Sequence, residues 1–389
     1  MSENQYLRFS RREFLTAAAG AGAATSLGPA WTMALADAMD PRISQVMSRT
    51  IGIDMHNHVY PAGTEPHPGQ RSSDPEQQAS ELFLEPVIKK SGLTAVCASF
   101  VLDFTQTDKL GDALNNYLRW LTVMDAQLES GHIGRALNVN DLRNAHDSGQ
   151  PTIIQSIEGA QFIEGHLDRV EMVYKRGVRH LQLLHIKDDM VSPLGDTIER
   201  PAHLGGLTPF GAQVIHECNR LGILVDLAHG APETVQAAVK VSTQPIIMSH
   251  TGLDARLGSN PKLAQMMKSH LISKEHAKVV ADAGGVIGVW TKLADTPKDF
   301  VENIRATVDT IGIDHVGIGT DLDLLSSRAG QRTSQAWPGI TSGFFYVVVG
   351  EMLRQGFIPD EIIKVGGGNF CRVFGKATAD HVTASGTRT

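Results

Sequence analysis

Ile53-Asp54-Met55-His56-Asn57-His58 is the stretch that decides the fold, because it joins a short apolar run to a pair of histidines. Seven further runs are built in a similar way, from Ile, Val and Leu without strict alternation. This pattern is typical of parallel strands that are buried on both faces. The eight predicted strands cover residues 51–56, 93–100, 152–158, 179–185, 222–229, 245–250, 285–290 and 315–321.

Segments with helical spacing lie between these strands. One example is 209–221, where Val214 and Cys218 fall on one apolar stripe of a helix. Eight strands that alternate with helices are typical of one α/β fold, the (β/α)8 TIM barrel. We expect a helical excursion at about 101–150. No repeat or linker divides residues 37–389, which are predicted to form a single domain.

Composition excludes several classes of protein. With 42% hydrophobic and 20% charged residues among 389, the chain is too apolar to be a disordered protein. Its net charge of −7 argues against binding to nucleic acid, which needs a basic surface. Cys97, Cys218 and Cys371 allow one disulfide at most, so a disulfide scaffold is excluded.

Residues 1–36 are predicted to be an export signal rather than part of the fold. Ser10-Arg11-Arg12-Glu13-Phe14-Leu15 precedes an Ala/Gly-rich run, and Ala34-Leu35-Ala36 follows that run. Adjacent arginines before a mildly apolar run and an A-x-A site are typical of a twin-arginine signal. We therefore expect a periplasmic protein. No other run is long and apolar enough for a membrane span, so none is expected in the mature chain.

Six of the predicted strands end in side chains that can bind a metal ion or move a proton. In a TIM barrel the carboxyl ends of the strands surround one active site, so side chains far apart in the sequence would converge there. These side chains are His56, His58, Glu158, His185, His229, His250 and Asp321.

The first strand indicates how two of these side chains would share an ion. Side chains alternate along a strand, so Asp54, His56 and His58 are predicted to face the barrel and Met55 and Asn57 to face outward. Two imidazoles two residues apart can chelate one ion, and the two oxygens of a glutamate can bridge two. Imidazole and carboxylate ligands without nearby cysteines suit an open catalytic zinc site. We predict one or two Zn²⁺ ions, held by His56, His58, Glu158, His229 and His250.

Most other histidines are expected to be solvated, because they lie in helical or loop stretches with polar neighbours. They are His132, His146, His166, His203, His216, His270 and His276.

Several motifs resemble those of the renal (membrane) dipeptidase family, the zinc dipeptidases of peptidase family M19. The resemblance runs from about residue 51 to 375. Its motifs are Gly205-Gly206-Leu207-Thr208-Pro209-Phe210-Gly211, Val225-Asp226-Leu227-Ala228-His229, Ser249-His250, Gly317-Ile318-Gly319-Thr320-Asp321 and Gly367-Gly368-Asn369-Phe370-Cys371-Arg372-Val373-Phe374.

This resemblance implies a barrel of the metallo-dependent hydrolase type, with a two-zinc site that hydrolyses dipeptides, often with a C-terminal D-residue. It implies that His56 binds one zinc, that Glu158 bridges both, and that His229 and His250 bind the other. In the same comparison, His185 corresponds to a histidine that contacts the substrate. Asp321 corresponds to an acidic residue near the substrate amine and the reacting water.

The chain departs from the family pattern at two places. The family motif H-N-D reads His56-Asn57-His58, so an imidazole replaces a carboxylate ligand and the site gains one unit of positive charge. The altered motif also resembles the wider amidohydrolase superfamily. After His250, Lys268-Ser269-His270-Leu271 stands where the family carries an Arg-Asn pair that binds the substrate carboxylate. That anchor is then expected at Arg256 or Lys268, or is absent.

The sequence therefore predicts a periplasmic metallo-dipeptidase that acts on small peptides. His185 would stabilise the oxyanion and Asp321 would shuttle a proton to the leaving amine, while His185, Asp321 and Arg256 would bind substrate. One alternative is another amidohydrolase, such as an N-acyl-amino-acid amidase or a lactonase. A second is a barrel without catalysis that binds metal or peptides. Pairing of two barrels into a homodimer is left open.

Overall fold

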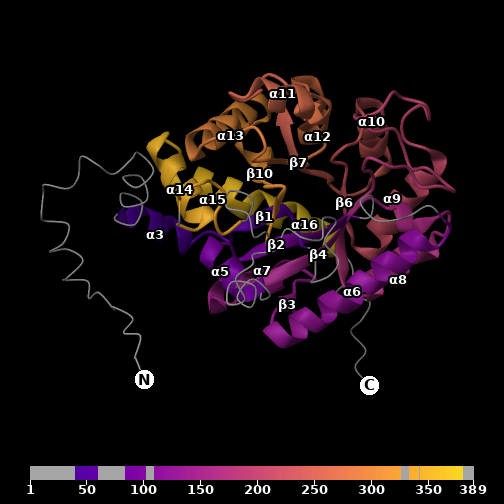
Figure 1. The fold of residues 1–389 in the computed structure, drawn as a ribbon, viewed down its shortest axis with the longest axis horizontal. Coiled ribbons are helices and arrows are strands. Elements are labelled where there is room, and N and C mark those ends of the chain that lie inside the picture. The colour runs from indigo at the N-terminus through magenta and orange to yellow at the C-terminus, as the bar shows by residue number, and fades with distance from the viewer. Residues whose placement is uncertain (1–39, 60–83, 102–108, 326–332, 341, 380–389) are drawn as a thin grey trace, which may run out of the picture.

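The computed structural model describes residues 40–59, 84–101, 109–325, 333–340 and 342–379 (Figure 1). The predicted signal at residues 1–36 lies outside the described residues. Within the described ranges, no helix is both long enough and apolar enough to cross a membrane.

Eight strands form a parallel ring, and the predicted TIM barrel is confirmed. Neighbours in the ring are hydrogen-bonded in the order β1 (Ile53–His58), β2 (Ala95–Val101), β4 (Thr152–Glu158), β5 (Val178–Gln182), β6 (Leu224–Asp226), β7 (Ile247–Leu253), β9 (Val286–Val289) and β10 (Val316–Ile318). The short β11 (Leu322–Asp323) follows β10 and pairs with β1, with Leu322 opposite Asn57, which closes the ring. The two-residue strand β3 (Gly134–Arg135) pairs with β4, and the two-residue strand β8 (Leu271–Ile272) pairs with β7.

Helices surround the strands (Figure 1). The described helices are α3 (Pro41–Met47), α5 (Leu84–Ser91), α6 (Asp112–Gly131), α7 (Val139–Ser148), α8 (Asp168–Lys175), α9 (Pro209–Leu221), α10 (Pro232–Val241), α11 (Pro261–Met267), α12 (Lys274–Asp282), α13 (Pro297–Ile311), α14 (Phe344–Arg354), α15 (Pro359–Ile363) and α16 (Asn369–Ala379). The elements α6, β3 and α7 occupy the stretch where a helical excursion was expected.

The boundaries of α9 follow from its sequence. The Thr208 side chain accepts a hydrogen bond from the Gly211 amide, and Pro209 occupies the first helical position, where no amide hydrogen is needed. At the other end Gly222 has a φ of 86°, a left-handed conformation that ends the helix. The helix therefore covers the residues that its spacing predicts.

The barrel interior is filled from alternate strand positions. Ala95 and Cys97 belong to one buried cluster with residues of five other strands, whereas Val96 and Ala98 belong to the cluster that packs against the outer helices. Helix α16 adds Phe370 and other apolar side chains to the interior cluster and contacts β6, β9 and β10. Helix α16 thus completes the interior cluster with aromatic side chains.

Strand β1 departs from the predicted alternation. Met55 packs in the interior cluster rather than outward, so that prediction is wrong. The cause is an irregularity in the pairing of β1 with β2 between Asp54 and Asn57. Asp54 accepts hydrogen bonds from the amide and hydroxyl of Thr320, at 2.8 and 2.6 Å, and so links β1 to the segment after β10.

Candidate metal centre

The barrel brings together all seven of the side chains that the sequence places at strand ends. His56 and His58 end β1, Glu158 ends β4, and His250 lies in β7. The other three follow their strands within a few residues, since β5 ends at Gln182, β6 at Asp226 and β10 at Ile318. These three are His185, His229 and Asp321.

Glu158 is the centre of the cluster, and both of its oxygens face imidazole nitrogens. Its Oε1 lies 3.4 Å from His185 Nε2, 3.5 Å from His229 Nε2 and 3.6 Å from His250 Nε2. Its Oε2 lies 3.4 Å from His56 Nε2 and 3.7 Å from His58 Nδ1. The Glu158 side chain is 2% exposed. Five histidines from four parts of the barrel therefore converge on one buried carboxylate.

The spacing within this cluster fits a metal ion better than a hydrogen-bond network. His56 Nε2 and Glu158 Oε2 are both buried, and neither has a hydrogen-bond partner among the described residues. Buried polar atoms are normally paired, so unpaired lone pairs that converge on one space indicate a ligand. The ligand atoms of three overlapping trios lie within 4.8 Å of one another. The trios are His56, His58 and Asp321; His56, Glu158 and His250; and Glu158, His185 and His229.

The electrostatics of the cluster also favour a cation. Burial alone would raise the pKa of Glu158, but the charges of His185 and His56 outweigh it and hold that pKa well below the usual range. Burial likewise opposes protonation of His229, yet the neighbouring carboxylates of Glu158 and Glu199 raise the pKa of His229 to about 10. The carboxylates thus stay ionised, as metal ligands must.

Two of the central histidines contact an outer carboxylate with their second ring nitrogen. His229 Nδ1 lies 2.5 Å from Glu199 Oε1, and His58 Nε2 lies 2.8 Å from Asp321 Oδ1. A carboxylate in this position fixes the orientation and tautomer of a metal-binding imidazole. Lys292 Nζ lies 3.3 Å from the other oxygen of Asp321. Burial would raise the pKa of Asp321, but Lys292 and His58 hold it well below its ordinary value.

His229 and Asp321 are held in an unfavourable backbone conformation. Their φ angles are 69° and 54°, and only two other non-glycine residues of the described ranges have positive φ. This conformation explains why β6 ends before His229, although the sequence predicts a strand through it. The His229 carbonyl accepts a hydrogen bond from the Ile198 amide at 2.9 Å, and the Asp321 amide donates to the His56 carbonyl at 3.1 Å. Strained residues that neighbours hold in place are frequent at active sites.

Arg256 does not join the cluster. Its guanidinium donates to Asn303 Oδ1 at 2.9 Å and to Glu302 Oε2 at 3.1 Å, and both partners lie on α13. A substrate carboxylate would have to compete with Glu302 for this arginine. Lys268 begins a single 3₁₀ turn, Lys268–His270, after α11.

One histidine that was expected to be solvated, His276, is buried, so that expectation is wrong; a second, His270, is partly exposed but contacts a carboxylate. His270 Nδ1 lies 3.0 Å from Glu199 Oε1, the oxygen that also contacts His229. His276 is 4% exposed on the inner side of α12. Polar neighbours in the sequence indicated neither the Glu199 contact of His270 nor the burial of His276, because both depend on packing between distant segments.

Sequence reasoning missed Glu199 and Lys292. Glu199 lies in the long segment between β5 and α9, where no periodicity marks it. Lys292 lies three residues beyond β9, at the same edge of the barrel as the other site residues, so the strand-end rule could have found it.

A second set of buried polar side chains comes from residues that precede the cluster residues in the sequence. His180 contacts Ser156 Oγ at 2.7 Å and Asp226 Oδ2 at 3.0 Å. Asp226 Oδ1 also accepts hydrogen bonds from the amides of Ala228 and Ser249. Burial would raise the pKa of Asp226, but His180 outweighs it and the pKa falls to about 2. This set ties β4, β5, β6 and β7 together beside Glu158 and His250.

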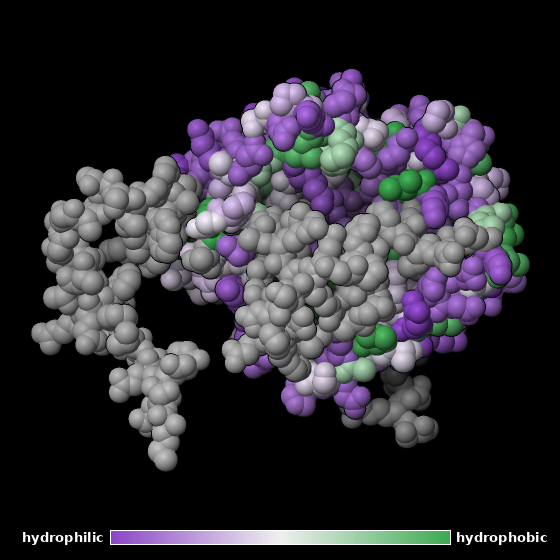
Figure 2. All heavy atoms as spheres, viewed as in Figure 1, coloured by the Kyte–Doolittle hydropathy of each residue, from purple (hydrophilic) through white to green (hydrophobic). Residues whose placement is uncertain are grey.

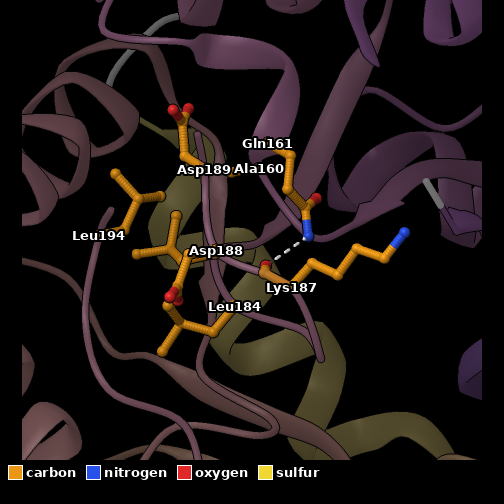
Figure 3. A pocket seen from close by; sticks show the side chains of 8 residues that line it. Ala160, Gln161, Leu184, Lys187, Asp188, Asp189 and Leu194 are labelled. Carbon is orange, nitrogen blue, oxygen red and sulfur yellow. Dashed lines mark hydrogen bonds between the residues drawn. The ribbon is translucent and has the colours of Figure 1, made fainter. Parts of the chain in front are cut away.

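A small pocket near the short helix Gln161–Ile163 is separate from the cluster (Figure 3). None of the seven cluster residues lines it, and among its lining residues the Gln161 side chain donates to the Lys187 carbonyl at 2.9 Å. Its lining residues are Ala160, Gln161, Leu183, Leu184, Lys187, Asp188, Asp189 and Leu194.

Known proteins resemble the chain along most of its length. A family model described as membrane dipeptidase (peptidase family M19) matches residues 41–386. Dipeptidase tcpJ of Claviceps purpurea is 27% identical over 64% of this chain and 56% of its own, and dipeptidase aclJ of Aspergillus oryzae is 27% identical over 62% and 54%. The chain thus spans about half the length of these curated relatives.

Solved structures share the fold. The probable dipeptidase PvdM of Pseudomonas aeruginosa superimposes with a TM-score of 0.69 at 18% identity, over 87% of this chain and 100% of that one. An amidohydrolase of the same organism gives 0.67 at 21% identity, over 87% and 99%. A metallopeptidase of Rhodobacter sphaeroides, liganded with a phosphinate mimic of L-Ala-D-Ala, gives 0.63 at 17% identity, over 84% and 99%.

Proposed function

The chain belongs to the membrane dipeptidase family, peptidase family M19, and from this premise we propose that it is a zinc-dependent dipeptidase. The single observation that carries the proposal is the convergence of five imidazoles on the two oxygens of Glu158. Because the unpaired atoms and the ionised carboxylate fit a metal ion, the site is suited to hydrolysis by a metal-activated water.

Two ions would divide the ligands between them. His56 and His58 would hold one, His229 and His250 the other, and Glu158 would bridge both through its separate oxygens. Zinc bound to imidazole and carboxylate ligands lowers the pKa of a bound water to near 7 and polarises a carbonyl group. Stabilisation of the developing negative charge and transfer of the proton are assigned to side chains of the protein.

His185 is positioned to act on the substrate carbonyl. Its side chain is 6% exposed, its Nε2 faces Glu158, and its ring lies edge-on to that of His229 at 4.8 Å. A hydrogen bond from this imidazole to the carbonyl oxygen would stabilise negative charge as it develops there.

Asp321 would accept the proton of the attacking water and return it to the leaving amine. His58 and Lys292 contact its two oxygens and keep it ionised, so it can serve as the base. A dipeptide with a C-terminal D-residue is the proposed substrate, and the dipeptide mimic bound to the Rhodobacter metallopeptidase supports that class.

A substrate panel tests the proposal. The zinc-loaded protein is expected to hydrolyse L-Ala-D-Ala and L-Ala-L-Ala, and the chelated protein to lose at least 100-fold of that activity. A zinc-loaded protein that turns over neither dipeptide would refute the proposal.

A second candidate function is another amidohydrolase activity, and His58 is the observation that favours it. An imidazole at this position, in contact with Asp321, gives the first strand the His-x-His pattern of the wider amidohydrolase superfamily. Turnover of N-acyl-amino acids or lactones in place of dipeptides would support this candidate.

We also propose export through the twin-arginine route, on the strength of Arg11 and Arg12 before an Ala/Gly-rich run. A reporter fused to residues 1–40 is expected to reach the periplasm. Replacing Arg11 and Arg12 by lysine should block that export, and undiminished export of the double variant would contradict the proposal.

A further inference from the structure

We propose that Glu199 is a positioning residue that fixes two imidazoles with one oxygen: His229 toward the metal centre and His270 toward the substrate. The proposal rests on the proposed function, because it concerns the same site. It adds a residue that no sequence motif marks, and it links metal affinity to substrate binding.

The contacts of Glu199 are specific. Its Oε1 lies 2.5 Å from His229 Nδ1 and 3.0 Å from His270 Nδ1, and its side chain is 7% exposed. Its Oε2 is buried and has no hydrogen-bond partner among the described residues. An ionised carboxylate only accepts hydrogen bonds, so both Nδ1 atoms act as donors to it.

The tautomer of His229 follows from this bond. With the hydrogen of Nδ1 directed at Glu199, Nε2 is the nitrogen that would bind a metal ion, and it lies 3.5 Å from Glu158 Oε1. A neutral side chain at position 199 would leave the ring free to rotate or to take the other tautomer.

Backbone contacts of the neighbouring residues hold Glu199 next to His229. Thr197 forms an antiparallel bridge with Gly230, and the Ile198 amide donates to the carbonyl of His229 itself. Backbone contacts at Thr197 and Ile198 therefore join the segment that carries the carboxylate to the segment that carries the imidazole.

Asp196 also anchors the segment that carries Glu199, through hydrogen bonds of its side chain and its carbonyl group. Its carboxylate accepts hydrogen bonds from the amides of His203, Leu204 and Gly206, and its carbonyl accepts from the Ala231 amide and the Thr234 hydroxyl. The loop between β5 and α9 is thus pinned to the turn between β6 and α10, which explains how Glu199 can hold a strained His229.

His270 is the most exposed of the three residues Glu199, His229 and His270. Its side chain is 21% exposed, and its ring centroid lies 5.7 Å from that of His229 and 6.3 Å from that of Trp290. It lies next to His229, at the edge of the metal centre that also carries Glu199. Since Arg256 is engaged by α13, His270 is the polar side chain that we assign to substrate binding on this side.

Variants at the two positions separate the two roles. In Glu199→Gln, zinc affinity measured by competition with a chromophoric chelator is expected to fall about 10- to 100-fold, and KM for L-Ala-D-Ala is expected to rise. In His270→Phe, zinc affinity should stay within threefold of the original. Its KM should rise at least fivefold, with kcat within twofold when zinc is saturating.

Matched controls show that the effects are local. The Glu171 side chain is 42% exposed on α8 and His216 is exposed on α9, so Glu171→Gln and His216→Gln should change neither zinc affinity nor KM. Melting temperatures recorded in chelator exclude loss of fold as the cause of a change, and Glu199→Leu serves as a second variant with the same expected loss of zinc affinity.

Two outcomes would overturn the proposal. One is zinc affinity of Glu199→Gln within twofold of the original protein, and the other is a loss of zinc affinity in His270→Phe as large as in Glu199→Gln. Should the original protein bind zinc but hydrolyse no dipeptide, the proposed function fails, while the zinc affinities still decide the role of Glu199.

Discussion

His58 lies between two carboxylates, with its Nε2 2.8 Å from Asp321 Oδ1 and its Nδ1 3.7 Å from Glu158 Oε2. His229 has the same relationship on the other oxygen of Glu158, where its Nε2 is 3.5 Å from Glu158 and its Nδ1 is 2.5 Å from Glu199. The centre is thus a row of three carboxylates joined by two imidazoles. The two outer carboxylates orient the imidazoles, and the central one is left for a metal ion.

Replacing His58 by Asp should strengthen the second metal site. With His58, two divalent ions would share Glu158 as their one direct carboxylate ligand, so their mutual repulsion is poorly offset. We expect the original protein to bind a second zinc at least tenfold more weakly than the first. In His58→Asp the second zinc should bind about tenfold more tightly, measured as metal per chain after dialysis against graded zinc concentrations.

His58→Asn is the control for this change, since it alters the side chain without adding charge. It should not tighten the second site. Equal tightening in the Asn and Asp variants would show that the charge at position 58 is not the cause.

Replacing Glu158 by Gln should remove the centre. The amide cannot supply an ionised oxygen to both sides, and five histidines would face it without a counter-charge. Zinc affinity is expected to fall at least 100-fold and dipeptide hydrolysis to disappear. The measurements are metal content after gel filtration and turnover of L-Ala-D-Ala.

Thermal melting provides an independent check of the same variant. Zinc at about 100 times its dissociation constant should stabilise the original protein by roughly 2.7 kcal/mol, which raises its melting temperature by several degrees. Glu158→Gln should show no such rise. A zinc-induced rise that survives in Glu158→Gln would mean that the stabilising ion binds elsewhere.

The strand-end rule shows how much of this site a sequence can predict. His56, Glu158 and Asp321 were found because parallel strands bring their carboxyl ends to one edge, which depends on topology alone. Met55 was misplaced because an irregularity in the pairing of β1 cannot be read from alternation. Glu199 was missed because its position depends on the pairing of Thr197 with Gly230, a contact between distant segments that leaves no periodic signal.

Asp226→Asn should destabilise the barrel without acting on the metal ligands directly. Asp226 has no exposed surface, and it accepts hydrogen bonds from His180 and from two backbone amides. Removing one partner of a buried charged pair typically costs about 3–5 kcal/mol. Urea unfolding of the chelated protein should show this loss. An unchanged free energy of unfolding would mean that the His180–Asp226 pair contributes no stability.

His276 should make the protein less stable in acid. Burial lowers the pKa of His276 from the ordinary 6.5 to about 4, and its Nε2 has no hydrogen-bond partner among the described residues. Above pH 6.5 the imidazole is neutral in both the folded and the unfolded chain, so its stability contribution is fully present. As the pH falls from 6.5 toward 4, the unfolded chain takes up a proton that the folded chain does not. Stability is lost through that window, by up to roughly 3 kcal/mol.

His276→Phe removes this titration and keeps an apolar ring in the buried position. Urea unfolding of the chelated proteins at pH 7.5 and pH 5 should show a fall in free energy that is about 2 kcal/mol larger for the original protein than for the variant. His216→Gln, which changes an exposed histidine, should behave like the original protein. Equal falls in the original protein and in His276→Phe would mean that His276 takes up its proton in the folded state too, and that the acid loss comes from other groups.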